Sequence, residues 1–154
     1  MLARIQNLYL LLVSLLAIAS MLLPFWSFDT GQIYIIADFS SATIPDTTYA
    51  LASTIGMLLS PATALVSFIS IFLYKNRNLQ RKVILLALLL FLGDLFAGLT
   101  AAHFMNEYFK SMQQAATHGP DTGLFILLPE PLLLMLALKG VSKDEKIANA
   151  YKRL

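Results

Sequence analysis

The stretch Lys75-Asn76-Arg77-Asn78-Leu79-Gln80-Arg81-Lys82 is a compact basic and polar segment near the middle of the 154-residue chain. A long apolar run lies on each side of it. We expect two membrane-crossing segments before this segment and two after it, so that it forms a turn that fixes the topology of the whole chain. It carries no recognisable catalytic motif.

The composition is that of an integral membrane protein. Hydrophobic residues make up 58% of the chain and charged residues only 13%, against about half and about a quarter in soluble domains. Because a spanning helix takes about 20 residues, the chain has room for about four spans with short loops. The net charge of +2 gives no support for a nucleic-acid partner, and a chain without cysteine offers no disulfide framework, thiolate nucleophile or Cys-based metal site.

Four apolar runs set the boundaries of the predicted spans. We predict an all-α integral membrane protein, a single domain of residues 1–154 with four transmembrane helices in an antiparallel bundle. The spans are expected at about 6–26, 50–74, 83–104 and 123–140, followed by a cytoplasmic tail at 141–154.

The first apolar run can also be interpreted as a signal peptide, and the loop after it as a hairpin. The triplet Ala17-Ile18-Ala19 has the form of a signal-peptide cleavage site. The apolar run continues past it into the aromatic segment 24–28, which favours an uncleaved span. In the loop that follows, residues 32–36 have strand propensity and are compatible with a short hairpin on the membrane surface.

Lysine and arginine are distributed unevenly over the predicted loops. All basic residues except Lys110 fall at the two ends of the chain or in the central turn. Basic residues in short loops resist translocation. We therefore expect both termini and the turn on the cytoplasmic side, and the loops 29–48 and 105–121 on the outer side.

Small residues recur at spacings of three and four along the second predicted span. Such a stripe favours close packing against another helix, which we expect to be the third span. Pairing the two spans from the turn brings Thr63 level with Asp94 and puts Ser60 and Ser67 one turn away. Since an ionised carboxylate in a membrane costs several kcal/mol unless it is paired, hydrated or protonated, we predict that a hydroxyl of this stripe donates to Asp94. The stripe consists of Ser53, Gly56, Ser60, Thr63, Ser67 and Ser70.

A second acid lies between two prolines, in Pro129-Glu130-Pro131. Two prolines remove two backbone donors, so we predict a kink or break in the fourth span. Depth counting puts Glu130 about one turn outward of Asp94, and His103 farther out. An ordered series of these side chains would suit a proton-coupled or small-solute transporter; the competing interpretation is that all three are structural or interfacial polar groups.

Other chemistry has little support in the sequence. Two histidines without i, i+4 spacing make no metal motif, and we expect no metal, no cofactor and no enzymatic activity. In the tail, residues 142–145 have the form of a capping box. We expect a short amphipathic C-terminal helix after Gly140, with its lysines near anionic headgroups.

Three short motifs recur in a known pattern: Arg4-Ile5-Gln6-Asn7-Leu8-Tyr9, the turn residues 75–80, and Lys143-Asp144-Glu145-Lys146 with Arg153-Leu154. In these motifs the chain resembles an uncharacterised four-helix inner-membrane family of Bacteroidota, domain of unknown function 4293. The resemblance covers the whole chain. It implies a multi-pass protein of a bacterial inner membrane and assigns no activity. Residues 151–152 and 129–131 depart from the family's pattern.

The three motifs meet at the predicted cytoplasmic ends of the helices. Topology explains their basic residues but not the uncharged Gln6, Asn76 and Gln80. One interpretation is that these amides hydrogen-bond the inner helix ends together. The other, which we favour for function, is a small accessory or scaffold subunit that docks another membrane or cytoplasmic protein in addition to its lipid bilayer. The expected docking residues are Gln6, Lys75, Asn76, Arg77, Gln80, Lys143, Asp144 and Glu145.

Overall fold

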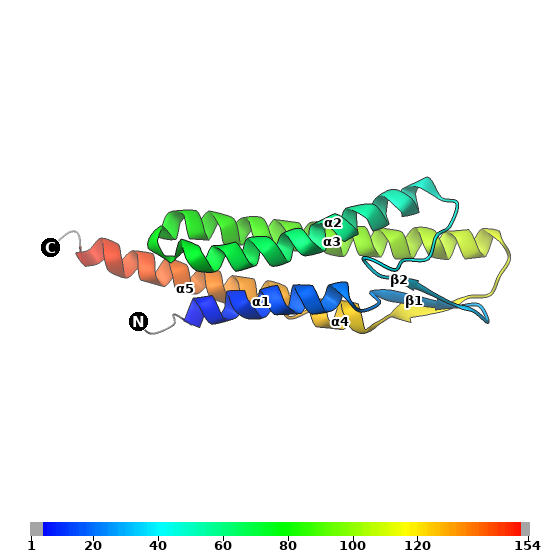
Figure 1. Ribbon diagram of the computed structural model, residues 1–154, viewed down its shortest axis with the longest axis horizontal. Coiled ribbons are helices and arrows are strands. Elements are labelled where there is room, and N and C mark those ends of the chain that lie inside the picture. The colour runs from blue at the N-terminus through cyan, green and yellow to red at the C-terminus, as the bar shows by residue number, and fades with distance from the viewer. Residues whose placement is uncertain (1–4, 152–154) are drawn as a thin grey trace.

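The computed structural model describes the backbone of residues 5–151 and the side chains of residues 5–147. Its helices lie side by side in an elongated body with a small sheet at one end (Figure 1). The helices are α1 (Ile5–Met21), α2 (Thr47–Phe72) with a 3-10 turn (Leu73–Lys75), α3 (Arg77–Ser111), α4 (Thr122–Leu127) and α5 (Glu130–Tyr151). α2 packs on α1 and α3, and α5 packs on the same two helices.

The helix α1 ends at Met21, short of the predicted end of the first span at 26, which is a correction. Pro24 has no N–H and disfavours helical geometry in Leu23. The amides of Leu22 and Leu23 instead donate to the Ala19 and Ser20 carbonyls at 3.2 and 3.1 Å, which closes a tight last turn. With 17 residues α1 is a shorter apolar helix, whereas Thr47–Lys75, Arg77–Ser111 and Thr122–Ile147 are long and apolar enough to cross a membrane.

A three-stranded antiparallel sheet of order β2-β1-β3 lies beyond the ends of α1 and α4 and beside the last part of α3 (Figure 1). The strands are β1 (Trp26–Asp29), β2 (Ile33–Ile36) and β3 (Thr117–Pro120). The β1–β2 pair confirms the hairpin for which residues 32–36 had the propensity. β3 was not predicted, because Gly119 and Pro120 give this segment low strand propensity and only its place at the edge of the sheet tolerates a proline.

The basic turn is short and closely held. Asn76 begins α3 as its N-cap, and its Oδ1 accepts from the Leu79 amide at 3.2 Å. From this turn α2 and α3 run back along each other in the most extensive helix contact of the fold, as the stripe of small residues predicted. α3 continues beyond the predicted limits of 83–104 at both ends.

The fourth apolar segment is broken where the prolines predicted it. α4 ends at Leu127 and α5 begins at Glu130. The expected separate helix after Gly140 is wrong, because α5 is continuous to Tyr151 and Ser142 lies inside it. Gly140 packs closely against Gln6, since a Cβ there would lie 3.0 Å from Gln6 Oε1. A glycine inside a helix costs only about 1 kcal/mol, which packing offsets.

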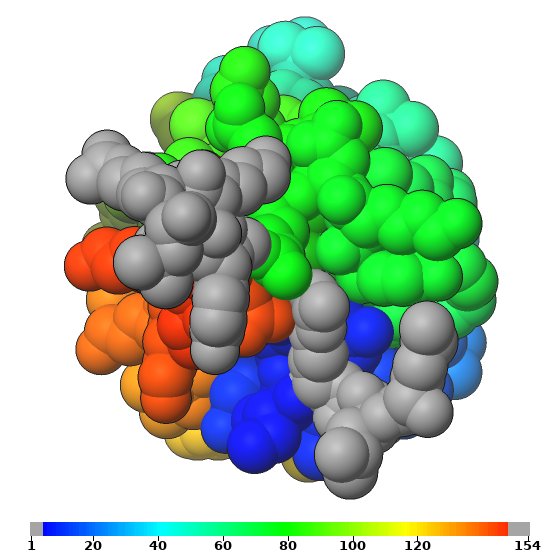
Figure 2. Space-filling view, turned by 90° about the vertical axis from the view of Figure 1, so that its left-hand side faces the viewer, coloured from blue at the N-terminus to red at the C-terminus, as the bar shows by residue number. Residues whose placement is uncertain are grey.

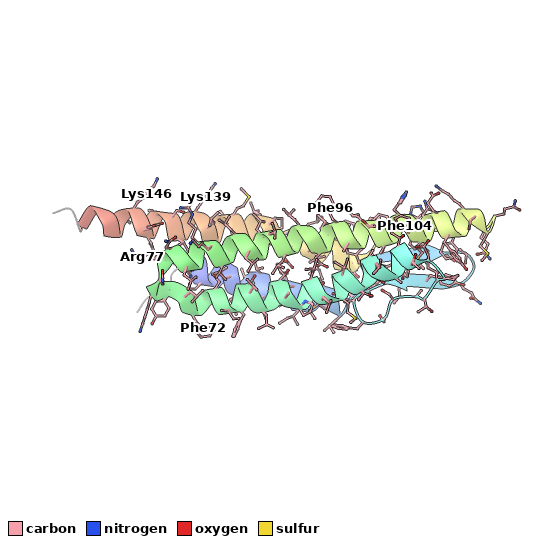
Figure 3. All side chains as sticks on the ribbon, turned by 90° about the horizontal axis from the view of Figure 1, so that it is seen from above. Phe72, Arg77, Phe96, Phe104, Lys139 and Lys146 are labelled. Atoms are coloured by element: carbon pink, nitrogen blue, oxygen red, sulfur yellow. The ribbon has the colours of Figure 1, made fainter. Side chains whose placement is uncertain are left out.

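Two buried apolar clusters lie at different depths, and a polar layer that includes Ser60 and Asp94 separates them. The cluster beside the sheet contains Phe28, Ile36, Tyr49, Ala52, Ala101, Ala102, Met105 and Phe109. The cluster toward the other end contains Leu10, Val13, Ile84, Ala87, Leu134, Ala137 and Val141. Large apolar side chains such as Phe72 and Phe96 project outward from the helices (Figure 3).

The described basic residues follow the predicted asymmetry in their position along the body. Arg77, Lys139 and Lys146 lie toward the end opposite the sheet (Figure 3), where the α2–α3 turn is located. Figure 2 views this end, with the α2–α3 region in green beside the start of α1 in blue and the end of α5 in orange and red. Among the described basic residues, Lys110 lies near the opposite end of α3. Arg4, Lys152 and Arg153 lie outside the described residues.

Candidate functional site

Asp94 on α3 is the centre of the polar layer and is 7% exposed. Ser60 Oγ on α2 donates to Asp94 Oδ2 at 2.9 Å, which confirms that a hydroxyl of the small-residue stripe meets this acid. The donor is Ser60 and not Thr63, whose hydroxyl donates to the Leu59 carbonyl of its own helix at 2.9 Å. Counting residues from the turn therefore placed the level of Asp94 one helical turn away from its donor, which belongs to the stripe as predicted.

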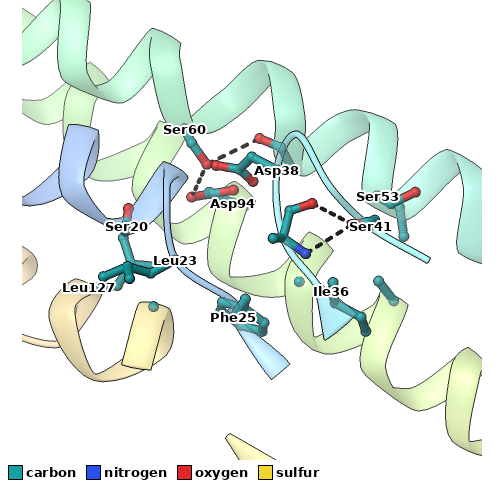
Figure 4. Close-up of a pocket in the computed structure, with 16 residues that line it drawn as sticks. Ser20, Leu23, Phe25, Ile36, Asp38, Ser41, Ser53, Ser60, Asp94 and Leu127 are labelled. Carbon is teal, nitrogen blue, oxygen red and sulfur yellow. Dashed lines mark hydrogen bonds between the residues drawn. The ribbon is translucent and has the colours of Figure 1, made fainter. Parts of the chain in front are cut away.

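Ser60 has more acceptors around it than protons to give. Its Oγ also lies 3.2 Å from the Gly56 carbonyl oxygen (Figure 4), and the Asp38 side chain is a further hydrogen-bond partner. A hydroxyl has one proton to donate. Ionised carboxylates cannot donate at all, so a further proton is needed if both acids are to be bonded to Ser60.

Asp38 comes from the segment between β2 and α2, which folds back over the pocket. The segment is held by Ser41, whose Oγ accepts from the Ala37 amide at 3.0 Å and donates to the Ala37 carbonyl. Burial raises the pKa of Asp38, and the hydrogen bond with Ser60 opposes part of the rise. Sequence reasoning missed Asp38, since an acid in an outer polar loop gives no sign that the loop turns inward.

The two carboxylates share a small cavity at the level where four helices meet the loop. It has a volume of about 30 Å³, which is enough for a water molecule or a small ion and too small for an organic solute. A Cβ on Gly56 would lie 3.5 Å from Asp94 Oδ1 and 3.9 Å from Asp38 Oδ1, so both carboxylates face this glycine. The lining includes Ser20, Phe25, Asp38, Gly56, Asp94 and Gly123. We call this the acidic pocket.

Glu130 lies close by at the first residue of α5. It is 0% exposed, and among the described residues neither of its carboxylate oxygens has a hydrogen-bond partner. It interacts electrostatically with Asp94, as Asp94 does with Asp38. Like charges at such positions repel one another. In the described part of the chain no ion pair includes any of these three acids.

His103 does not join the acids. Its side chain is exposed, and its ring packs edge-on against Phe104 with centroids 5.4 Å apart. The predicted series of His103, Glu130 and Asp94 is therefore not assembled. The structure instead brings Asp38 to Asp94. Among the described residues no group of three His, Cys, Asp or Glu side chains is placed to hold a metal ion.

At the opposite end, the expected docking residues divide into buried and exposed ones. Gln80 is 0% exposed and its Nε2 donates to the Ser70 carbonyl at 3.0 Å, so that α3 is tied to the end of α2. Gln6 is buried and approaches Asp144 Oδ2 at 3.5 Å, while Arg77 Nη1 donates to the Asp144 carbonyl at 2.6 Å. These contacts match the interpretation in which the amides join the helix ends.

Other docking residues remain at the surface. Lys75, Asn76 and Lys143 are exposed, and Glu145 is half-buried. Asn76 is already engaged through its side-chain oxygen as the cap of α3. The exposed part of this end is therefore mainly basic.

The fold indicates the class of protein to which the chain belongs. The protein is mostly helical, and three of its helices are long and apolar enough to cross a membrane, which is compatible with a helical membrane protein. Residues 2–154 match the model of a protein family, and the chain belongs to that family, the domain of unknown function DUF4293. No curated protein and no solved structure matches the chain significantly.

Proposed function

We propose that the acidic pocket binds a proton and that the protein acts as a small proton-coupled membrane transporter. The observation that carries this proposal is that the single Ser60 hydroxyl faces Asp94, Asp38 and the Gly56 carbonyl. Such a site has a place for one more proton, carried by either carboxyl. Intramembrane acids of this kind commonly mark proton or ion pathways.

The size of the pocket sets its ligand class. A cavity of about 30 Å³ accommodates a water molecule, a hydronium or a monovalent inorganic cation. A solute that moves with the proton would have to pass elsewhere or require the loop at Asp38 to open. We therefore propose the proton as the ligand of the acidic pocket, and any co-transported solute would bind outside it.

The proposed membrane arrangement is the one that the charge asymmetry favours. Four transmembrane helices, with α4 and α5 as the broken fourth, form an antiparallel bundle in a bacterial inner membrane, with both termini in the cytoplasm. α1 is short for a span, and a bilayer thins locally around short helices at modest cost. In this arrangement the sheet and Asp38 lie toward the outer side, so the acidic pocket is loaded from outside.

The proposal is tested with purified protein in liposomes that enclose a pH-sensitive dye. An imposed pH gradient with a potassium–valinomycin potential should acidify liposomes containing the protein faster than empty ones. Asp94→Asn should abolish the difference, and Thr63→Val, at the same level of α2 but bonded only within its own helix, should preserve it. Equal rates with and without protein, or full activity in Asp94→Asn, would overturn the proposal.

A second candidate is the accessory or scaffold subunit, which has no enzymatic step either. The exposure of Lys75 and Lys143 at one end favours it, whereas the burial of Gln6 and Gln80 removes two of the uncharged residues on which it rested. Changing Gln80 or Arg77 would disturb helix contacts as well as any docking. The sharper variant is therefore Lys75→Gln with Lys143→Gln. A stoichiometric partner that copurifies from native membranes, is lost in this variant and is kept in Asp94→Asn would favour the scaffold.

A further inference from the structure

Lysines follow one face of α5 at the end of the molecule opposite the sheet. Lys139, Lys143 and Lys146 are spaced i, i+4, i+7, and all three are exposed. Residues at these spacings lie above one another on a helix. Figure 3 labels Lys139 and Lys146, whose side chains project away from the helical body on the same side.

The packing of α5 does not use this face. α5 turns Ala137 and Val141 inward, where both are buried, and places Gly140 against Gln6. The lysines line a shallow surface groove of about 340 Å³ together with Leu138 and Ser142. The groove thus combines ammonium groups and a hydroxyl beside an apolar side chain.

The same helix face becomes apolar farther from the end. Leu132 and Met135 precede Lys139 by seven and four residues, and they are 61% and 50% exposed. Read toward the helix end, one face therefore presents apolar side chains first and ammonium groups next. A phospholipid has the same order of acyl chain and charged headgroup.

We propose that this face of α5 binds an anionic membrane phospholipid, with the lipid phosphate in the groove between Lys139, Lys143 and Lys146. The charges are complementary, because lysine ammonium groups bind phosphate as point charges and Ser142 adds a hydroxyl that can donate. Leu132 and Met135 lie along the first part of an acyl chain. Basic pockets at membrane-protein ends bind lipid headgroups in this way.

The test is native mass spectrometry of the full chain from detergent micelles with phosphatidylglycerol or phosphatidylcholine of the same acyl chains. The wild type should retain phosphatidylglycerol in preference to phosphatidylcholine. Lys139→Gln/Lys143→Gln/Lys146→Gln should weaken its binding on the order of 100-fold, since each lysine near an anionic lipid contributes to the attraction. The matched control is Lys75→Gln/Arg81→Gln/Lys82→Gln, which removes the same charge from exposed positions of the nearby turn.

The outcomes separate the site from its alternatives. Preferential retention that falls in the α5 variant and persists in the turn variant supports the lipid site. An equal loss in both variants would mean general attraction to a basic end, and equal retention of the two lipids would mean no headgroup selection; either overturns the proposal. Displacement of the lipid by an equal concentration of inorganic phosphate would also overturn it, because the acyl chain would then contribute nothing. Thermal unfolding of both variants establishes that they are folded.

Discussion

Ser60 on α2 and Asp94 on α3 are joined by a 2.9 Å hydrogen bond between two apolar clusters. When Asp94 is ionised, the Ser60 hydroxyl donates to it. When Asp94 is protonated, the carboxyl can donate to Ser60 Oγ, and the Ser60 hydroxyl can then turn to the Gly56 carbonyl at 3.2 Å. The contact between α2 and α3 is therefore compatible with both protonation states, as a proton-binding site requires.

Asp94→Asn is expected to separate proton binding from folding. The Asn amide resembles a protonated carboxyl and can donate to Ser60 Oγ, so the hydrogen bond survives. We expect the free energy of unfolding to change by less than about 1 kcal/mol, while proton uptake into liposomes is lost. Thermal unfolding in detergent and the dye assay measure the two properties on one preparation. A variant that fails to fold would show that the carboxylate itself is required for stability.

Ser60→Ala is expected to destabilise the protein. It leaves the buried Asp94 and the half-buried Asp38 without their shared hydroxyl, and an unsatisfied buried polar group costs about 1–3 kcal/mol. Thr63→Val is the control, since it removes a buried hydroxyl that bonds only within α2. The thermal midpoints of the two variants should differ, with Ser60→Ala lower. Equal midpoints would mean that the Ser60–Asp94 bond between α2 and α3 stabilises the protein no more than the Thr63–Leu59 bond within α2.

Gly56→Ala is expected to close the pocket without straining α2. The added methyl would lie 3.5 Å from Asp94 Oδ1, an ordinary contact, and alanine raises helix propensity by about 1 kcal/mol. Because the methyl occupies space in a cavity of about 30 Å³, it should exclude water or an ion and slow proton uptake. A stable variant with unchanged uptake would place the proton path elsewhere.

The helix pairing and the acid at its centre could be predicted because both follow from local patterns. The stripe of small residues on α2 indicates a helix partner, the basic segment indicates the turn, and Asp94 in an apolar run requires a donor. The break at Pro129 follows in the same way from the missing amides of proline.

The position of Asp38, the third strand and the packing at Gly140 could not be predicted, because they depend on contacts between distant parts of the chain. Asp38 lies in the pocket because the loop after β2 folds back over it, next to the β1–β2 pair. The pairing of β3 with β1 joins segments far apart in sequence, and neither Gly119 nor Pro120 favours a strand. Gly140 resembled the end of a helix, but it lies inside α5 and packs closely against Gln6. No pattern within one segment contains this information.

Asp38→Asn should change how stability depends on pH. Burial raises the pKa of Asp38 above its usual 3.8, so the folded chain holds this proton more tightly than the unfolded chain. The free energy of unfolding therefore falls as pH rises from about 3.8 to the raised pKa. Above that pKa, Asp38 adds no further pH dependence to the free energy of unfolding. Removal of Asp38 also removes its repulsion of Asp94.

The measurement is the difference in thermal midpoint between Asp38→Asn and the wild type across this pH range. The variant should be the more stable at neutral pH, and the advantage should shrink as pH falls toward 4. Asp29→Asn, in an exposed position on β1, is the control for the loss of one acidic side chain. An advantage that grows on acidification would show that the folded state prefers ionised Asp38.

Gly123→Ala tests the contact that holds α4 against the start of the sheet. The Gly123 amide donates to the Pro24 carbonyl at 2.8 Å. A Cβ at this position would lie 2.8 Å from that oxygen and 2.9 Å from the Leu23 carbonyl oxygen. Both are backbone atoms, so the segment after α1 would have to move away from α4. Overpacking of this kind costs about 1–3 kcal/mol.

Gly119→Ala is the matched control, because nothing lies within 4 Å of a Cβ there. It should leave the free energy of unfolding unchanged to within about 0.5 kcal/mol. Since alanine favours a helix over glycine by about 1 kcal/mol, a lower thermal midpoint in Gly123→Ala can come only from the lost contact and not from helix propensity. Gly123 also lines the acidic pocket, so the same variant should slow proton uptake where Gly119→Ala does not. Equal midpoints for the two variants would mean that the backbone of 23–24 yields without cost and that α4 is not fixed by this contact.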